Sequence, residues 1–197
     1  MMASGRPSVI LLGGPNGAGK STAAPALLRG SLGVTEFVNA DVLASGLSGF
    51  APDPMAMTAG RIMVQRLREL AACRASFAFE TTLASRSFAP WVARLVQSGY
   101  VFRLVYLWLP NADVAVARVA ERERTGGHHV PEETVRRRYD RGLRNFFKLY
   151  RPLAAVWRMY DNASVSGPRL IANGNGVAAI RVRDSVTWDA IRSRYEP

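Results

Sequence analysis

The sequence is poor in the residues that stabilise small extracellular domains or bind metals. Its 197 residues include one cysteine, Cys73, and two adjacent histidines, His128 and His129. A single thiol excludes an internal disulfide, and neighbouring histidines without Cys or carboxylate partners at ligand spacing do not predict a zinc site. No apolar run reaches the roughly 18 residues of a membrane span, and the first residues lack a secretory signal pattern. We therefore expect a cytoplasmic protein that does not span a membrane.

Lysine is scarce as well, although the chain is strongly basic. Lys20 and Lys148 are the only lysines, and arginine supplies the remaining positive charge. The net charge is +11. Such a charge is typical of nucleic-acid binding, but the aromatic and basic recognition motifs of the usual RNA-binding modules are missing. Arginine-rich codon usage accounts for part of the excess, and clusters at residues 118–124 and 136–144 suit the binding of phosphate. Nucleic acid is therefore a less favoured partner.

The most informative stretch that is present is a phosphate-binding loop. It follows the apolar run at residues 9–12 and precedes a helical pattern at 20–29, which is the strand–loop–helix context that the motif requires. Glycines let successive backbone N–H groups point at an anion, the Lys20 ammonium would contact the β- and γ-phosphates, and the Ser21 hydroxyl would bind Mg²⁺. We expect Lys20 to be an exposed loop residue. The predicted nucleotide-binding residues are Gly14, Pro15, Asn16, Gly17, Ala18, Gly19, Lys20, Ser21 and Thr22.

Strand and helix patterns alternate along the rest of the chain. We expect an α/β fold of the P-loop kinase type over residues 1–197, with a parallel sheet flanked by helices on both faces. An arginine-bearing lid is expected at about 118–138 and a small hairpin near the C-terminus. The expected strands are 9–12, 35–39, 75–79, 100–109, 169–172 and 178–182. The expected helices are 20–29, 55–74, 88–98, 111–124, 131–148, 150–159 and 187–195.

Polar residues that follow the strands are the candidates for chemistry, because ligands bind at the carboxyl edge of such a sheet. Asp41 could accept the proton of an attacking hydroxyl, or it could cap the helix that follows. Glu80 could bind a substrate hydroxyl or a Mg²⁺-bound water, or it could be a carboxylate facing solvent. Thr82 adds a hydroxyl nearby.

The lid candidates are arginines on either side of a glycine-bearing loop. Arg118 and Arg122 share a helix face and could contact one γ-phosphate together. The alternative is a solvated basic face paired with neighbouring glutamates, and we expect it to hold for some of them. His128 is expected in the lid, in contact with substrate.

With these residues assembled, the sequence resembles the zeta-toxin family of P-loop kinases, most closely its compact stand-alone bacterial members. The resemblance covers about residues 9–162. The segments that carry it are residues 14–22, 38–41, 79–83, 118–122, 126–133 and 136–139.

The resemblance implies ATP-dependent phosphorylation of a UDP-activated amino sugar such as UDP-N-acetylglucosamine. It implies Asp41 as general base, Lys20 with lid arginines at the γ-phosphate, Glu80 and Thr82 at the sugar nucleotide, and a separate antitoxin chain as a possible partner. This sequence departs from the toxin prototypes in the lid, where Gly126 to Pro131 lack the arginine that precedes the corresponding turn. Two alternatives stay open: a kinase for another hydroxyl compound (a nucleoside, a sugar or an antibiotic), and a nucleotide-gated RNA- or protein-binding module.

The alternative of a nucleotide-gated RNA- or protein-binding module is tested by measuring affinity for RNA. If the charge of +11 serves phosphate clamps and reflects codon usage, binding to RNA at physiological salt should be no tighter than the non-specific range, about 10⁻⁴–10⁻⁶ M. A filter-binding titration at several salt concentrations measures this. Nanomolar affinity for a defined RNA would favour the binding module over the kinase.

Overall fold

A seven-stranded sheet organises the chain, in the order β2-β3-β1-β4-β5-β6-β7. The computed structural model describes residues 5–48, 53–127, 129–164 and 166–196. The strands β1 to β5 pair in parallel, and β6 and β7 add antiparallel strands at one edge. The bounds are β1 Ser8–Gly13, β2 Glu36–Val38, β3 Phe77–Thr81, β4 Val101–Trp108, β5 Val156–Asp161, β6 Arg169–Asn175 and β7 Ala178–Val182. The expected α/β fold is therefore confirmed.

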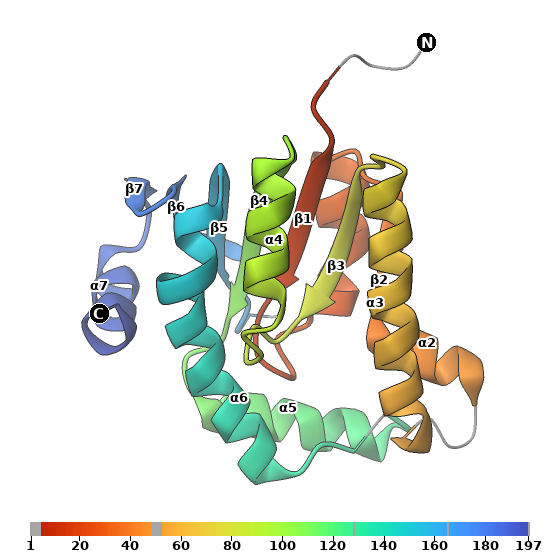
Figure 1. Cartoon of the computed structure of the whole chain (residues 1–197). Helices are drawn as coiled ribbons and strands as arrows, with labels where there is room; N and C mark the ends of the chain where they lie inside the picture. The colour runs from red at the N-terminus through yellow and green to blue at the C-terminus, as the bar shows by residue number, and fades with distance from the viewer. Residues whose placement is uncertain (1–4, 49–52, 128, 165, 197) are drawn as a thin grey trace.

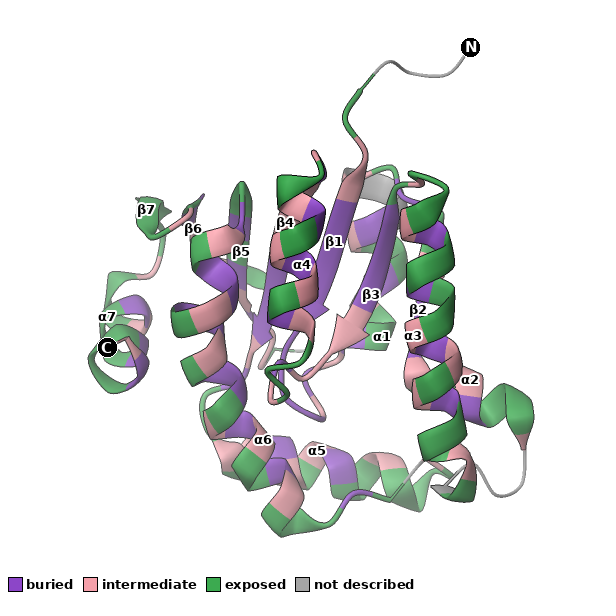
Figure 2. Cartoon of the chain, viewed as in Figure 1, coloured by how far each residue is buried: buried purple, intermediate pink, exposed green. Residues whose placement is uncertain are grey.

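Helices cover both faces of this sheet (Figure 1), as right-handed crossovers between parallel strands require. The helix α1 lies on one face, whereas α3, α4 and α6 lie on the other, and α5 runs below the carboxyl ends of the strands. The helices are α1 Lys20–Ala24, α2 Ala40–Leu47, α3 Ala56–Ala72, α4 Phe88–Gln97, α5 Ala112–Arg124, α6 Glu132–Asn145 and α7 Ser185–Tyr195, with irregular turns η1 Pro25–Ser31, η2 Asp53–Met55, η3 Phe146–Tyr150 and η4 Arg151–Leu153. Buried residues gather on β1, β4 and the sheet-facing sides of the helices (Figure 2). No helix of the described segments is long and apolar enough to span a membrane.

The structure corrects one element and reassigns another. Residues 150–159, expected as a helix, end within the strand β5, in which Trp157, Met159 and Asp161 are buried and alternate with less buried neighbours. A period of two over six residues is short, and the preceding irregular turns obscure where it begins. The expected C-terminal hairpin is present as β6 and β7, but it extends the main sheet instead of forming an appendage.

The two edges of the sheet differ in polarity. At one edge, Glu36 of the short strand β2 pairs with Arg66 of α3. At the other edge, every residue of β7 is exposed, and the large apolar side chains of Val177 and Ile180 face solvent beside Arg181. The open edge is thus apolar and basic at once.

A glycine in α6 lets that helix approach the carboxyl end of β3. A Cβ atom on Gly142 would lie 2.5 Å from the carbonyl oxygen of Thr82, a distance that no side chain tolerates. A Cβ atom added to Gly60, in the interior of α3, would have no other atom within 4 Å. The close approach, and not helix propensity, therefore explains the glycine in α6.

These two helical glycines should respond oppositely to alanine. Gly142→Ala should lower the free energy of unfolding by about 1–3 kcal/mol, because the added methyl group forces α6 away from β3. Gly60→Ala should raise it by about 0.5–1 kcal/mol, since alanine is the better helix former. Urea unfolding followed by circular dichroism measures both. A stabilised Gly142→Ala variant would contradict the close packing.

Candidate active site

Backbone packing fixes the phosphate-binding loop between β1 and α1. The loop follows the buried strand β1, and two of its glycines lie against other elements in conformations that L side chains avoid. Gly14 has φ +147°, and a Cβ atom there would lie 2.5 Å from the carbonyl oxygen of Leu107 in β4; Gly17 has φ +76°, and its Cβ would lie 2.8 Å from that of Ala115 in α5. The residues present therefore fit a backbone cradle for phosphate.

The Lys20 side chain is buried, contrary to the exposed residue expected from the sequence. Its ammonium donates to the carbonyl oxygen of Pro15 at 2.9 Å and lies 3.6 Å from the Glu80 carboxylate, and the two side chains are 7% and 11% exposed. Burial lowers the pKa of Lys20 below its ordinary value, although Glu80 and Asp41 oppose the shift. An anionic ligand in the loop would restore the missing counter-charge.

A hydrogen-bonded group of three side chains lies beside the lysine. The Ser21 hydroxyl donates to Glu80 at 2.9 Å, and the Asn39 amide donates to both Ser21 and Glu80, at 3.2 and 2.8 Å. The hydroxyl and the carboxylate are hard oxygen donors of the kind that Mg²⁺ prefers. No group of three or more His, Cys, Asp or Glu residues suited to a metal occurs in the described part of the chain, so phosphate oxygens and water would complete the coordination.

Asp41 lies in the first turn of α2 with its carboxylate exposed. The cap of this helix is Asn39, whose side-chain oxygen accepts from the backbone N–H groups of Asp41 and Val42 at 2.8 and 3.3 Å. The alternative interpretation of Asp41 as the N-cap is therefore wrong. Burial lowers the pKa of both Lys20 and Arg138, and the negative charge of Asp41 opposes that lowering in each case.

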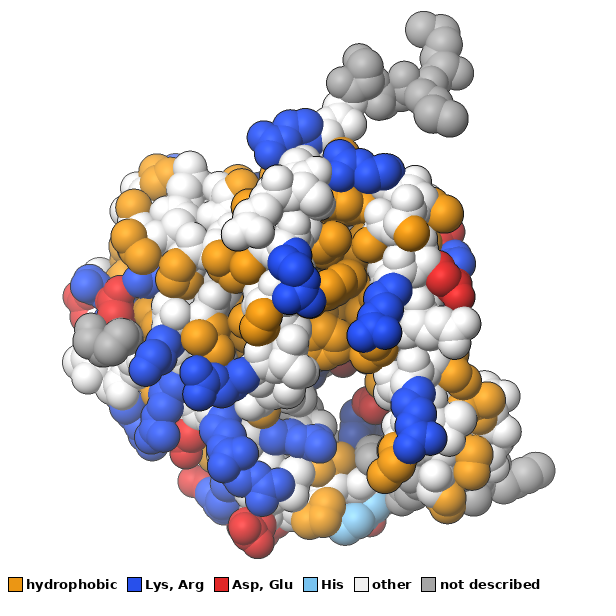
Figure 3. All heavy atoms as spheres, viewed as in Figure 1, with side chains coloured by type: hydrophobic (Ala, Val, Ile, Leu, Met, Phe, Trp, Pro, Cys, Tyr) orange, Lys and Arg blue, Asp and Glu red, His pale blue; other side chains and the backbone are white. Residues whose placement is uncertain are grey.

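One open pocket of about 690 Å³ brings these groups together. Figure 3 shows the molecule hollowed below α4 and beside the lower half of α3, with charged side chains around the opening. The lining residues are Asn16, Gly17, Gly19, Lys20, Ser21, Thr22, Asn39, Ala40, Asp41, Gly60, Met63, Glu80, Thr81, Thr82, Ala84, Ser85, Phe88, Arg118, Arg122 and Arg138. It thus contains most of the candidates from the sequence, whereas His128 lies outside the described residues.

The arginines of α5 and α6 divide into two groups. Arg124, Arg136 and Arg137 pair with carboxylates: Arg124 with Glu121, Arg136 with Asp113 and Glu132, and Arg137 with Glu133. For these three the expected solvated face is confirmed. Arg118, Arg122 and Arg138 instead line the pocket.

Arg118 contacts the chain that follows β5. Its guanidinium donates to the carbonyl oxygens of Asn162 and Ala163 at 2.8 and 2.6 Å, and the Asn162 amide donates to Ala18 in the phosphate loop at 2.7 Å. Arg118 therefore holds the chain after β5 beside the phosphate loop, and its expected contact with the γ-phosphate stays a prediction.

The sequence places Arg138 only within the arginine cluster that follows the lid loop, without singling it out, and it does not indicate Asn162 as a site residue. Arg138 is half buried, and it donates to the Asn16 side chain at 3.4 Å. Its spacing from the buried Val135, Tyr139 and Gly142 is helical, so periodicity distinguishes it from its two neighbouring arginines. Asn162 directly follows β5, and the missed strand concealed its position at the carboxyl edge.

The fold and the site define a P-loop domain of the kinase-like type. The chain belongs to the family whose model, AAA_33, is described as an AAA domain, and which matches residues 9–148. A protein of Haemophilus influenzae described as uncharacterized is 27% identical over 128 residues, which cover 64% of this chain and 88% of the relative.

Solved structures share the fold at low sequence identity. A chain of the AvrRxo1-ORF1:-ORF2 complex with ATP is 16% identical with a TM-score of 0.70; the match covers 95% of this chain and 64% of that one, so this chain spans less than two thirds of its length. The PezAT toxin–antitoxin system of Streptococcus pneumoniae matches at 15% identity and TM-score 0.64, covering 98% and 87%. A gluconokinase of Sinorhizobium meliloti matches at 18% and 0.50, covering 81% and 85%. These likenesses show the fold alone.

The positioning role of Arg118 is tested through its neighbour. Arg118→Ala and Asn162→Ala should each weaken binding of a non-hydrolysable ATP analogue by about tenfold, because each removes a hydrogen bond that holds the phosphate loop. The double variant should be little weaker than either single one, since both act on the same link. Isothermal titration calorimetry measures the three affinities. Fully additive losses would instead indicate that Arg118 contacts the nucleotide directly.

Proposed function

We propose that this protein is an ATP-dependent kinase that transfers the γ-phosphoryl group to a hydroxyl of a small molecule. The observation that carries the proposal is the convergence of a buried lysine, an exposed carboxylate and pocket-lining arginines on one cavity. Both residues line this cavity, where the buried Lys20 would bind phosphate and the exposed Asp41 would meet the acceptor.

At the phosphate end, the loop amides and Lys20 would hold the β- and γ-phosphates. Ser21 and Glu80 would bind a Mg²⁺ ion and its water, and this ion would neutralise charge on the phosphate oxygens. The hydrogen bonds from Asn39 and Ser21 to Glu80 favour this task over a contact with the sugar nucleotide. Arg122 and Arg138 line the same cavity and would stabilise the negative charge of the transferring group.

At the acceptor end, Asp41 would accept the hydroxyl proton. The acceptor oxygen forms a bond to the γ-phosphorus, the bond from that phosphorus to the bridging oxygen breaks, and ADP leaves with the electron pair. General-base help of this kind is worth about 10²–10⁴ in rate. Thr82, which directly follows β3, lines the same pocket and would position the acceptor.

A UDP-activated amino sugar such as UDP-N-acetylglucosamine is the acceptor we propose first. The support is the resemblance of the sequence to zeta toxins together with a fold shared with the PezAT system. On the same grounds an antitoxin chain is a possible partner. Another hydroxyl compound is the alternative, and the fold shared with a gluconokinase keeps a simple sugar among the candidates.

The decisive experiment is ATP consumption across a panel of acceptors, with each product identified by mass spectrometry. The panel holds UDP-N-acetylglucosamine, N-acetylglucosamine, gluconate, nucleosides and aminoglycosides. Lys20→Met serves as the control that lacks the phosphate contact. Consumption of ATP without any phosphorylated product, at a rate that no acceptor changes, would contradict the kinase proposal.

Asp41→Asn should separate a kinase from an ATP binder. Acceptor phosphorylation should fall at least about a hundredfold, because the amide cannot take the hydroxyl proton. Stability should change by less than about 1 kcal/mol, since Asn39 caps the helix and Asp41 contributes only its favourable charge in the first turn. Nucleotide affinity should stay close to that of the unmodified protein. A variant that keeps its rate per molecule would show that the base is another residue, with Glu80 the first to test.

A further inference from the structure

A second hollow lies between α3 and α4, next to the candidate active site. It has a volume of about 220 Å³ and is lined by Val64, Leu67, Arg68, Ser87, Phe88, Trp91 and Arg94. Its aromatic wall is supported from beneath by β3, where Phe77 stacks on Trp91 with ring centroids 6.0 Å apart. Figure 3 shows apolar side chains in the hollow between the two helices and basic side chains on both sides of it. We call this hollow the α3–α4 groove.

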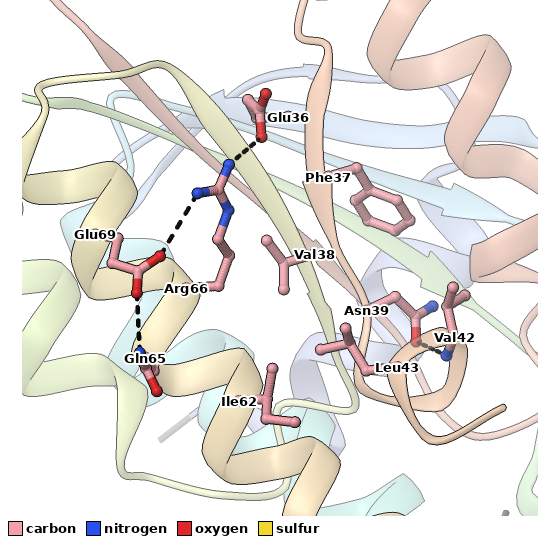
Figure 4. A pocket seen from close by; sticks show the side chains of 10 residues that line it. All are labelled: Glu36, Phe37, Val38, Asn39, Val42, Leu43, Ile62, Gln65, Arg66 and Glu69. Carbon is pink, nitrogen blue, oxygen red and sulfur yellow. Dashed lines mark hydrogen bonds and ion pairs between the residues drawn. The ribbon is translucent and has the colours of Figure 1, made fainter. Parts of the chain in front are cut away.

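The two arginines of the α3–α4 groove are exposed, and neither has a partner among the described residues. No hydrogen bond or ion pair joins the side chain of Arg68 or of Arg94 to the rest of the described chain. Arg66, two positions before Arg68, shows the contrast: it lies between Glu36 and Glu69, at 3.1 and 3.5 Å (Figure 4). The pocket drawn there, on the outer side of α3, therefore contains its own counter-charges. The α3–α4 groove does not.

The α3–α4 groove continues from the active-site pocket. Phe88 lines both, and Met63 of the pocket is adjacent in sequence to Val64 of the groove. Arg68 follows Met63 by five positions and Arg94 follows Phe88 by six. At 1.5 Å per helical residue, the Cα atoms of the two arginines lie about 7–9 Å along their helices from the residues at the rim of the pocket. The two helices thus place the arginines at similar distances from the rim of the active-site pocket.

We propose that the α3–α4 groove binds a phosphate group of the acceptor, with Arg68 and Arg94 as its ligands and Trp91 and Phe88 against the apolar part of the molecule. This inference rests on the proposed kinase activity and narrows its substrate class. The acceptor is an elongated molecule that carries a phosphate ester roughly 10 Å from the hydroxyl that is phosphorylated, as estimated from the helix rise. Paired guanidinium groups match the charge and the oxygen geometry of phosphate.

Binding is tested without turnover. Phenyl phosphate is titrated by calorimetry into protein saturated with Mg²⁺ and ADP, so that the phosphate loop is filled. The unmodified protein should bind it, and Arg68→Gln with Arg94→Gln should weaken binding at least about tenfold, the loss expected for charge-assisted hydrogen bonds. Phenol, which lacks the charge, should bind no tighter to the unmodified protein than to the double variant.

Arg61→Gln is the matched control, because Arg61 is exposed on the same helix but does not line the α3–α4 groove. Its affinity for phenyl phosphate should equal that of the unmodified protein. Absence of binding, equal binding by the double variant, or an equal loss in the control would each overturn the proposal.

Kinetics then separate this inference from the proposed function. With UDP-N-acetylglucosamine as acceptor, the double variant should raise KM at least about tenfold with kcat within about twofold, whereas KM for N-acetylglucosamine should not change. Arginine-dependent binding of phenyl phosphate with no product from any acceptor would refute the kinase and leave a phosphate site. If acceptors are phosphorylated with KM values that do not change in the double variant, the proposal of a phosphate site in the α3–α4 groove is wrong and the kinase proposal stands.

Discussion

The buried ammonium of Lys20 is the constraint on which the rest of the site depends. An isolated charge at this depth would cost several kcal/mol, and the single carboxylate of Glu80 offsets only part of that, as the lowered pKa of Lys20 indicates. Asn39 and Ser21 hold Glu80 in place, and Asn39 at the same time begins α2 and so places Asp41. One short polar network thus sets the phosphate end and the acceptor end of the pocket together.

The sequence was sufficient for the sheet core and for the phosphate loop, because both depend on local patterns: apolar runs and a glycine motif. It failed at β5, where the alternation of Val156–Asp161 is brief and follows a long helix. That error removed Asn162 from consideration, since its position at the carboxyl edge exists only once the strand is known. The prediction that Lys20 is exposed was wrong for the same reason, because β3 and the phosphate loop, which are distant from each other in sequence, both pack against its side chain. Long-range packing, which no local pattern encodes, accounts for each miss.

The same packing limits how the arginine-bearing helices can act. The first half of α5 lies against the phosphate loop, through the carbonyl oxygen of Ala115 near Gly17 and through the bonds of Arg118 to the chain after β5. Arg122 is one turn further along this fixed helix. Arg138 belongs to α6, and among the described residues the only hydrogen bond from that helix to the loop is its long one to Asn16. Arg122 and Arg138 line the same pocket, but the helix that carries Arg122 is packed against the phosphate loop more extensively than the helix that carries Arg138.

The open edge at β7 has a consequence for the protein in solution. Unpaired strand edges that expose apolar side chains invite association with other copies, and charge on the edge opposes it. In this protein, association is opposed by the charge of Arg181 and by the overall charge of +11, and both repulsions act through the solvent. The range of such repulsion shrinks from about 10 Å at 0.1 M salt to about 3 Å at 1 M. Colloidal stability should therefore decline as ionic strength rises, so that dilute buffers, and not concentrated salt, favour dispersed molecules.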